Sequence, residues 1–441
     1  MRDSPRQLRK QLNADAIIDT LRQRFATLPD ARVKPTCPLA DALMSGFALF
    51  ALKDPSLLAF DQRRQEPHSN LHTVYGIEHI PCDSQLRGIL DPVDPEFLRP
   101  GFTDLFRHLQ RGKALERLAF FGGHYLLSFD GSGYFSSQKV HCPHCLERHH
   151  RNGTVTYHHQ MLAAVLVHPD YREVIPLMPE PIRKQDGDTK NDCERNAAKR
   201  FFAGFRRDHP CLPVIAVGDG LTANAPLIRA LGGHNIRFIL GAKPGDHTFL
   251  FQQLEAGVAS GQTQVVTWWD ARRKTLHHYR WLNQVSLNEA NPDVLVNVVE
   301  YWEIKDNQVT FHGSWVTDLE VSETTVESVM RGGRARWKIE NETFNTLKNQ
   351  GYQFEHNFGH GEQHLSVVFG VLMLLAFLSD QMQQLCCTLF QAVWQKAGSK
   401  RQLWEEMRHL FHAFAFGSMR ELYEALLRGF VKQKPVLLDD P

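Results

Sequence analysis

The sequence predicts an α/β protein in which a mixed-sheet core carries a β-rich insertion and is flanked by helical regions at both ends. Three observations support this fold class. Residues 1–120 show helix-like patterns, residues 121–247 alternate short apolar strands with helices, and residues 248–325 are rich in β-forming residues with turn signals between them. Residues 326–381 return to the core, so we expect two separated stretches to form one domain. Residues 382–441 form a predicted helical C-terminal region.

Composition places the chain among ordinary globular proteins. Of its 441 residues, 42% are hydrophobic and 22% are charged, and the net charge is +1, so any nucleic-acid-binding surface must be local. The longest apolar run, Val367–Leu378, is too short to span a bilayer and suits a buried helix. The N-terminus lacks the apolar stretch of a signal peptide, and eight cysteines in so long a chain do not make a disulfide framework. We therefore expect a reduced, cytoplasmic protein that does not enter a membrane.

The N-terminal region is predicted to be helical and to offer a DNA-binding surface. The expected helices are Leu8–Leu28, Ala40–Leu52, Asp83–Leu90 and Phe102–Leu109. The first of them carries four basic residues. Basic side chains on small helices can contact DNA phosphates, but a solvated helical surface has the same pattern. Charge patterning leaves both interpretations open.

Two strands of the predicted core end in an acidic residue. Tyr125–Phe129 is a short apolar run followed by Asp130 and glycine, and Pro213–Gly218 is a buried strand followed by Asp219 and glycine. If these strands are neighbours, the two carboxylates meet at one edge of the sheet, where open α/β sheets bind their ligands. The other predicted core elements are strands at Met161–Val167, Glu173–Met178 and Ile236–Gly241 and helices at Asn191–His209 and Asn224–Leu231.

A cysteine- and histidine-rich loop at residues 141–160 interrupts the core. A Cys-Pro-His-Cys sequence is followed by two His-His pairs, which is the spacing of zinc ligands. We predict that Cys142, Cys145, His150 and His159 bind a structural Zn²⁺, with His149 and His158 as alternates. The alternative is a pair of free cysteines in a histidine-rich loop.

The insertion contains tryptophans beside basic residues. Trp268, Trp269 and Trp281 lie near Arg272–Lys274, so they could stack on bases while the cations hold phosphates. We take Trp269 as the candidate for DNA contact. Tryptophans of a hydrophobic core have the same sequence pattern, and core packing is therefore the alternative.

The stretch Arg334–Lys348 contains no proline or glycine and is predicted to be one helix. At 100° per residue, Arg336, Glu340 and Lys348 fall with three apolar residues within one arc about 120° wide, whereas Glu342 lies on the opposite face. A carboxylate on an apolar face is costly unless it is paired. Arg336, one turn away, could be that partner, which would make this a core helix with an internal ion pair.

Asp130, Asp219 and Glu340 could instead form one metal site. Carboxylates that lie close together repel one another and need cations to stay together. Such a set suits Mg²⁺ or Mn²⁺, and two ions about 4 Å apart could stabilise both the attacking and the leaving oxygen in phosphodiester chemistry. Arg336 and Lys348 would then hold the DNA backbone.

Four blocks of the sequence carry a resemblance to a known family. They are Phe129-Asp-Gly-Ser-Gly, Val217-Gly-Asp-Gly, Trp-Val-Thr-Asp-Leu with Gly-Arg-Ala-Arg-Trp-Lys-Ile-Glu-Asn-Glu, and His-Cys-Pro-His-Cys with Tyr-His-His-Gln. Over roughly residues 80–380 the chain resembles the DDE transposases of bacterial insertion sequences, in the group with a β-rich insertion before the catalytic Glu.

The resemblance implies an RNase H-like core and Mg²⁺-dependent DNA strand cleavage and strand transfer. By position, Asp130, Asp219 and Glu340 match the catalytic triad, and Arg336 and Lys348 resemble the basic pair of the family. The implied partners are double-stranded DNA, as terminal inverted repeats and as target, and a second copy of the chain in a synaptic homodimer. The implied location is the bacterial cytoplasm, at the nucleoid when the protein is bound to DNA.

Two positions depart from the family pattern, and two other functions stay open. Gly333 stands where the family has Tyr, and Lys348 lies one residue further from the Glu than is usual. The chain could be a domesticated or inactive relative that only binds DNA, although a pure binder has no need to hold three repelling carboxylates. It could also be a metal-dependent nuclease, because water and a DNA 3′-hydroxyl are activated by the same metal pair.

Overall fold

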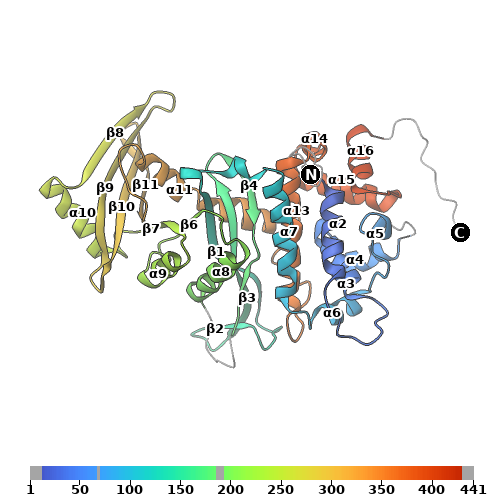
Figure 1. Ribbon diagram of the computed structural model, residues 1–441. Helices are drawn as coiled ribbons and strands as arrows, with labels where there is room; N and C mark the ends of the chain where they lie inside the picture. The colour runs from blue at the N-terminus through green and yellow to red at the C-terminus, as the bar shows by residue number, and fades with distance from the viewer. Residues whose placement is uncertain (1–11, 67–69, 185–192, 430–441) are drawn as a thin grey trace. The chain divides into compact units, whose positions relative to one another are not determined.

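The structure is a computed structural model that describes residues 12–66, 70–184 and 193–429. The described residues divide into two compact units, whose elements are labelled in Figure 1. The residues up to Leu115 and those from Thr346 form a helical unit, and Glu116–Asn345 form a unit built on a sheet. The chain thus leaves the helical unit once and returns to it.

The helical unit is built around α13 (Leu365–Cys386), which packs against α3 (Leu39–Ala51) and α7 (Arg99–Arg111). By length and composition α13 could cross a membrane, but its most apolar stretch is entirely buried, as in the core helix of a folded domain. The other helices of this unit are α2 (Ala14–Ala26), α4 (Leu57–Arg64), α5 (Asn70–Thr73), α6 (Asp83–Leu90), η2 (Pro95–Leu98), α12 (Asn345–Asn349), α14 (Thr388–Ala397), α15 (Lys400–Ala413) and α16 (Met419–Arg428).

A polar cluster lies inside this helical core. The ammonium group of Lys53 is fully buried, donates to the carboxylate of Asp380 and lies 3.9 Å from the centre of the Trp404 ring. The Tyr352 hydroxyl donates to the same carboxylate. Burying an unpaired charge is expensive, so each charged group of the cluster depends on the other.

The second unit is one mixed sheet of 11 strands. The strands are ordered β2-β3-β1-β6-β7-β11-β10-β9-β8, and β4 and β5 pair with β3. Their bounds are β1 Tyr125–Ser137, β2 Leu146–His149, β3 Val155–His168, β4 Tyr171–Pro176, β5 Glu180–Ile182, β6 Val214–Gly218, β7 Arg237–Gly241, β8 Gln264–Asp270, β9 Thr275–Asn288, β10 Asn291–Lys305 and β11 Gln308–Thr317. The insertion strands therefore continue the core sheet through the β7–β11 pair, where Val316 lies opposite Leu240.

Helices cover the sheet at the strands that carry the acidic residues. Helix α8 (Glu194–Asp208) packs on β1, β3 and β5, and Phe202 meets Phe129 of β1 edge to face. Helix α11 (Val326–Arg334) packs on β7 and β11, and a Cβ on Gly332 would lie 2.8 Å from the Ile239 side chain. The π-helix η5 (Ile339–Phe344) follows and lies against β1, β3 and β4. The unit also contains α9 (Ala225–Gly233), α10 (Thr248–Ser260), η3 (Leu115–Leu118) and η4 (Phe121–Gly123).

The predicted fold class, an α/β protein with a mixed-sheet core, helical N- and C-terminal regions and a β-rich insertion, is confirmed. Two local expectations are wrong. The insertion opens with a helix, α10, and the stretch Arg334–Lys348 is a helix end, a π-helix and a short α-helix rather than one regular helix. The expected start of the first helix at Leu8 lies outside the described residues.

Candidate active site

Asp130 and Asp219 lie beside each other because their strands are parallel neighbours. Strands β1 and β6 pair in parallel from Tyr125–Val214 to Ser128–Val217. Each aspartate is two residues beyond this last pair, so the two positions are level on strands about 4.8 Å apart. Strand β1 does not end at Asp130, as the glycines after it suggested, but continues to Ser137 along β3. Only its pairing with β6 ends there, and that opens the edge on which both carboxylates stand.

Asp130 projects from the face of the sheet that η5 covers. Side chains alternate along a strand, so Asp130 points to the same side as Ser128, whose hydroxyl donates to the carbonyl of Arg336 at 3.1 Å. On β6, a Cβ on Gly218 would lie 2.8 Å from the Phe129 ring, which packs on α8. Gly218 therefore faces α8, and Asp219 follows it just beyond the end of β6, where it lines the same pocket as Asp130.

Arg336 joins Glu340 to the site. One guanidinium nitrogen, Nη1, lies 2.7 Å from Glu340 Oε1 and 3.5 Å from Asp130 Oδ2. The guanidinium also lies 4.6 Å from the centre of the exposed Trp337 ring. The ion pair between Arg336 and Glu340 was the simplest interpretation of the sequence, and the structure adds Asp130 as its third member. In this arrangement, one cation screens the repulsion between two carboxylates.

Charge crowding perturbs Asp130. Burial and the negative charges of Glu194, Glu340 and Asp219 together raise the pKa of its carboxyl group to about 7, against the opposing charge of Arg336. A carboxyl group that titrates near neutrality through desolvation and charge partners is typical of a functional site. A bound divalent cation would offset the repulsion between these carboxylates, so the donor set fits a hard metal ion such as Mg²⁺ or Mn²⁺.

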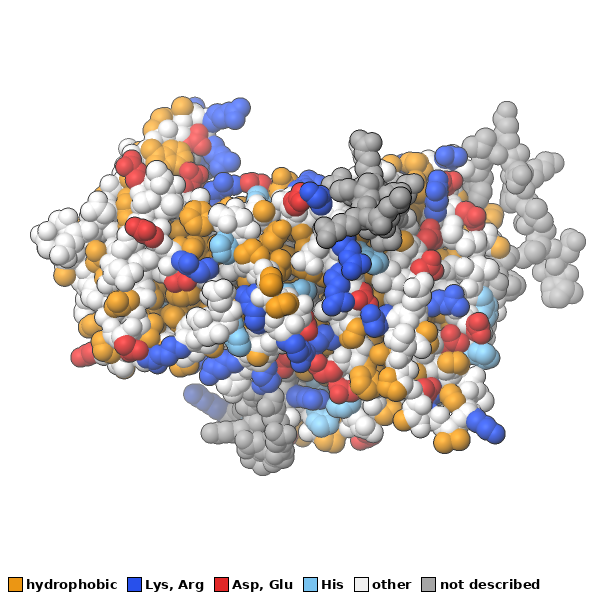
Figure 2. All heavy atoms as spheres, viewed as in Figure 1, with side chains coloured by type: hydrophobic (Ala, Val, Ile, Leu, Met, Phe, Trp, Pro, Cys, Tyr) orange, Lys and Arg blue, Asp and Glu red, His pale blue; other side chains and the backbone are white. Residues whose placement is uncertain are grey.

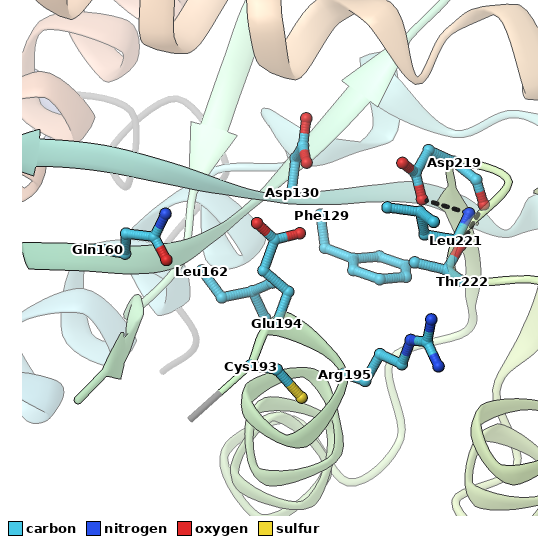
Figure 3. A pocket seen from close by; sticks show the side chains of 10 residues that line it. All are labelled: Phe129, Asp130, Gln160, Leu162, Cys193, Glu194, Arg195, Asp219, Leu221 and Thr222. Carbon is cyan, nitrogen blue, oxygen red and sulfur yellow. Dashed lines mark hydrogen bonds between the residues drawn. The ribbon is translucent and has the colours of Figure 1, made fainter. Parts of the chain in front are cut away.

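Glu194 is a fourth carboxylate that the sequence pattern did not single out. It opens α8, and a Cβ on Gly131 would lie 2.2 Å from its Oε1 atom, so it approaches β1 on the face opposite Asp130. Figure 3 shows Asp130, Asp219 and Glu194 around a pocket floored by Phe129 and lined by Leu221, whose backbone N–H donates to Asp219 at 3.0 Å. Burial and the charge of Asp219 raise the pKa of Glu194. An acid in the first turn of a basic helix gave no signal in the sequence, because such acids are common helix stabilisers.

The sequence also predicts DNA contacts for Lys348 and Trp269. Lys348 belongs to the helical unit, where its ammonium group lies 2.8 Å from Glu355 Oε1. Trp269 stands on β8 with 57% of its surface exposed, so it is not a core residue. Trp281, in contrast, is buried, as the alternative interpretation held.

A second cluster gathers two cysteines and a histidine. Cys142 Sγ and Cys145 Sγ are 3.9 Å apart, and His159 Nε2 lies 3.4 Å and 3.5 Å from them. In a tetrahedral zinc site, ligand bonds of about 2.3 Å to sulfur and about 2.0 Å to nitrogen place two sulfurs about 3.8 Å apart and a sulfur and a nitrogen about 3.5 Å apart. The three buried side chains therefore match one face of a zinc tetrahedron.

His150, predicted as a further zinc ligand, does not join this cluster. Its ring is exposed, and its Nε2 atom lies 2.8 Å from the Thr156 hydroxyl. Strand β2 pairs with β3 up to His149 and Val155, so the turn that follows carries His150 to the far end of the hairpin. The spacing in the sequence suited a zinc ligand from each histidine pair, but the hairpin register brings only His159 to the two cysteines.

Comparisons with known proteins give a distant structural likeness. No protein-family description matches the chain, and no curated protein matches it. Among solved structures, the chain resembles one from the cryo-EM structure of a piggyBac transposase synaptic complex with hairpin DNA. The likeness has a TM-score of 0.38 at 10% sequence identity, and covers 99% of this chain and 83% of that one. Similarity at this level does not assign a function, which rests on the residues of the site.

Proposed function

We propose that this protein is a DDE transposase that cleaves DNA at the ends of an insertion sequence and joins them to a target. The observations that carry the proposal are the parallel pairing that sets Asp130 beside Asp219 and the single guanidinium of Arg336 between Asp130 and Glu340. The raised pKa of Asp130 supports the proposal, because it indicates that Arg336 alone does not offset the negative charge of the carboxylates.

The three carboxylates would hold the catalytic divalent cations, Mg²⁺ or Mn²⁺. When bound, such a pair of ions supplies activation of the attacking oxygen and stabilisation of the leaving 3′-oxygen. Asp130 and Asp219 are fixed by the pairing of β1 with β6 and of β1 with β3, so their spacing does not depend on a flexible loop. Glu340 sits on a π-helix, and such turns are frequent at functional sites.

Arg336 would bind a phosphate of the DNA backbone. Its guanidinium is held by Glu340 and Asp130 and stacks on Trp337, so it is positioned before substrate arrives. If metal ions bind the carboxylates of Asp130 and Glu340, the N–H groups of the Arg336 guanidinium become available to hydrogen-bond a DNA phosphate. Lys348 and Trp269 are further proposed DNA contacts, by resemblance and by exposure respectively.

The Cys142, Cys145 and His159 cluster would hold a structural Zn²⁺. His159 lies opposite Phe135 on β1, so the ion would fasten the loop after β1 to β3. Gln160, the next residue of β3, lines the pocket beside Asp130, so the loop and the acidic edge share the same pair of strands. We assign the ion a supporting role, with no part in the chemistry.

The partners of the proposed reaction are double-stranded DNA, as terminal inverted repeats and target, and a second copy of the chain. A reaction that joins two ends needs two active sites, hence the proposed synaptic homodimer. The proposed location is the bacterial cytoplasm, at the nucleoid when the protein is bound to DNA.

A cleavage and joining assay tests the proposal. The substrate is a labelled duplex made from the DNA that flanks this gene, incubated with Mg²⁺ and a circular target. We expect nicking and joining by the parent, loss of both in Asp219→Asn and Glu340→Gln, and retention of both in Glu342→Gln, the matched control from the same π-helix. Cleavage without joining would identify a nuclease instead. A parent that neither cuts nor joins, or an Asp219→Asn variant equal to it, would leave the DNA-binding alternative.

A further inference from the structure

A groove of about 720 Å³ lies between the insertion strands and α11, and it shares no residue with the pocket in Figure 3. Its walls come from β8, β9 and β10 on one side and from α11 and the β3–β4 turn on the other. In Figure 2, basic side chains gather at the end of the insertion where the β8–β9 and β10–β11 turns lie. No pattern in the sequence indicates that α11 and the insertion enclose a common space.

Two residues that line this groove each carry a buried polar atom without a partner. His277 is 6% exposed and Tyr279 is fully buried, yet among the described residues neither His277 Nε2 nor the Tyr279 hydroxyl has a hydrogen-bond partner. Leaving a buried donor or acceptor unsatisfied costs about 1–3 kcal/mol. Two such atoms at one groove therefore indicate a ligand that supplies the missing hydrogen bonds.

His277 is held so that its free nitrogen serves the groove. Its Nδ1 atom lies 2.8 Å from the Tyr301 hydroxyl, which in turn lies 3.3 Å from Glu303. The ring stacks on Trp268, with centroids 4.1 Å apart, and on Tyr301. The Tyr301 hydroxyl donates to Glu303, so His277 Nδ1–H donates to Tyr301 and Nε2 is left as an acceptor, which a water molecule or a donor group of a ligand can satisfy but a phosphate oxygen cannot.

The charge of the groove favours an anion. Six Arg and Lys side chains line it against four carboxylates. Three of these carboxylates are already paired, Asp170 with Arg331 at 2.6 Å, Glu303 with Arg334 at 2.9 Å and Asp270 with Arg273 at 3.9 Å. Arg272 and Arg273 stand exposed on the β8–β9 turn, where their backbone N–H groups donate to Asp270. Their guanidinium groups are thus presented on a closed turn at the mouth of the groove.

We infer that this groove binds a backbone phosphate of the DNA substrate, with the Tyr279 hydroxyl as its buried donor and Arg272 and Arg273 at its mouth. The inference rests on the proposed function and adds a DNA contact made by the insertion. A phosphate oxygen accepts from a hydroxyl and from guanidinium groups alike. The cations are spread along an open groove rather than gathered around one point, which suits a continuous strand better than a free phosphate ion.

Three variants test the inference by fluorescence anisotropy on duplex DNA across a range of salt concentrations. Tyr279→Phe removes only the unpartnered hydroxyl, so we expect DNA binding about three- to tenfold weaker and a thermal midpoint no lower than that of the parent. Arg272→Gln should reduce the slope of log K against log salt by about 1, the effect of one lost phosphate contact. Lys274→Gln makes the same charge change on the same turn but outside the groove lining, and should keep the parental slope.

Parental DNA affinity in Tyr279→Phe, or equal slopes in Arg272→Gln and Lys274→Gln, overturns the inference. If Asp219→Asn still abolishes cleavage in that case, the proposed function stands without it. A parent that binds no DNA at any salt concentration overturns both. Inorganic phosphate forms a further arm: if it raises the thermal midpoint of the parent but not of Tyr279→Phe, while both bind DNA equally, the groove is a phosphate-ion site and the DNA assignment is wrong.

Discussion

Asp130→Asn should stabilise the protein while it disables the site. The Asp130 pKa of about 7 in the folded state lies roughly three units above its ordinary value of 3.8. Each unit corresponds to about 1.4 kcal/mol, so holding this carboxylate ionised costs the folded protein about 4 kcal/mol above pH 7. An asparagine of nearly the same shape avoids that cost because it carries no charge. The effect should be confined to the sheet unit, in which the carboxylate is buried.

The pH dependence of the free energy of unfolding determines the sign of this effect. A carboxyl group whose pKa is raised on folding binds more protons in the folded state than in the unfolded state between the two pKa values. Stability is therefore lost as the pH rises from about 4 to about 7. The advantage of Asp130→Asn should be about 4 kcal/mol at pH 8 and about 2 kcal/mol at pH 5.

Thermal unfolding at the two pH values measures the effect. For a domain of this size, 1 kcal/mol shifts the midpoint by about 2–4 °C, so the variant should melt roughly 8–16 °C above the parent at pH 8 and about half as far above it at pH 5. Mg²⁺ should narrow the gap at pH 8, because it would stabilise only the parent. A variant no more stable than the parent at pH 8, or equally stabilised at both pH values, would refute the electrostatic account of the site.

Two further predictions concern the zinc cluster and the helical core. Metal analysis of the purified protein should find Zn²⁺ in the parent and in His150→Gln but not in the Cys142→Ser, Cys145→Ser double variant; equal zinc in all three would remove the assignment. Lys53→Met should lower the stability of the helical unit by about 3–5 kcal/mol because it leaves Asp380 buried without its cation, and adding Asp380→Leu should recover most of the loss in thermal unfolding. A single variant as stable as the parent would show that the buried pair contributes nothing.

The fold class and the acidic edge of the sheet could be predicted from the sequence because both depend on local patterns. An apolar run followed by Asp and Gly marks the end of a strand pairing, and two such runs in an alternating α/β order are candidates for parallel neighbours. The pairing of β1 with β6 fulfils that condition for Asp130 and Asp219. The roles of these residues in catalysis stay predictions.

The features that the sequence did not reveal depend on longer-range geometry. The π-helix at Ile339–Phe344 has no composition signal, and the arc drawn for Arg334–Lys348 assumed a regular α-helix. A π turn takes up one residue more than an α turn, so eight residues from Glu340 to Lys348 correspond along this helix to seven residues of α-helix. The extra residue of the π turn matches the one-residue departure of Lys348 from the family spacing.

Two other features followed from how strands and helices meet. His150 and His159 have equally suitable spacing from the cysteines, and only the hairpin of β2 and β3 separates them. Glu194 lies far from Asp219 in sequence and reaches the same pocket because α8 begins beneath Gly131. No periodicity or motif reports such a meeting point.

The most direct test of the central claim is a change of metal preference at the carboxylate site. Thiolate is a softer ligand than carboxylate and suits Mn²⁺ better than Mg²⁺. DNA cleavage by the parent, by Asp219→Cys and by Asp219→Asn would therefore be measured with each ion. The account predicts that Asp219→Cys is inactive with Mg²⁺ and regains cleavage with Mn²⁺, whereas Asp219→Asn regains much less. Equal cleavage by all three proteins with Mg²⁺ would contradict a metal site at Asp219.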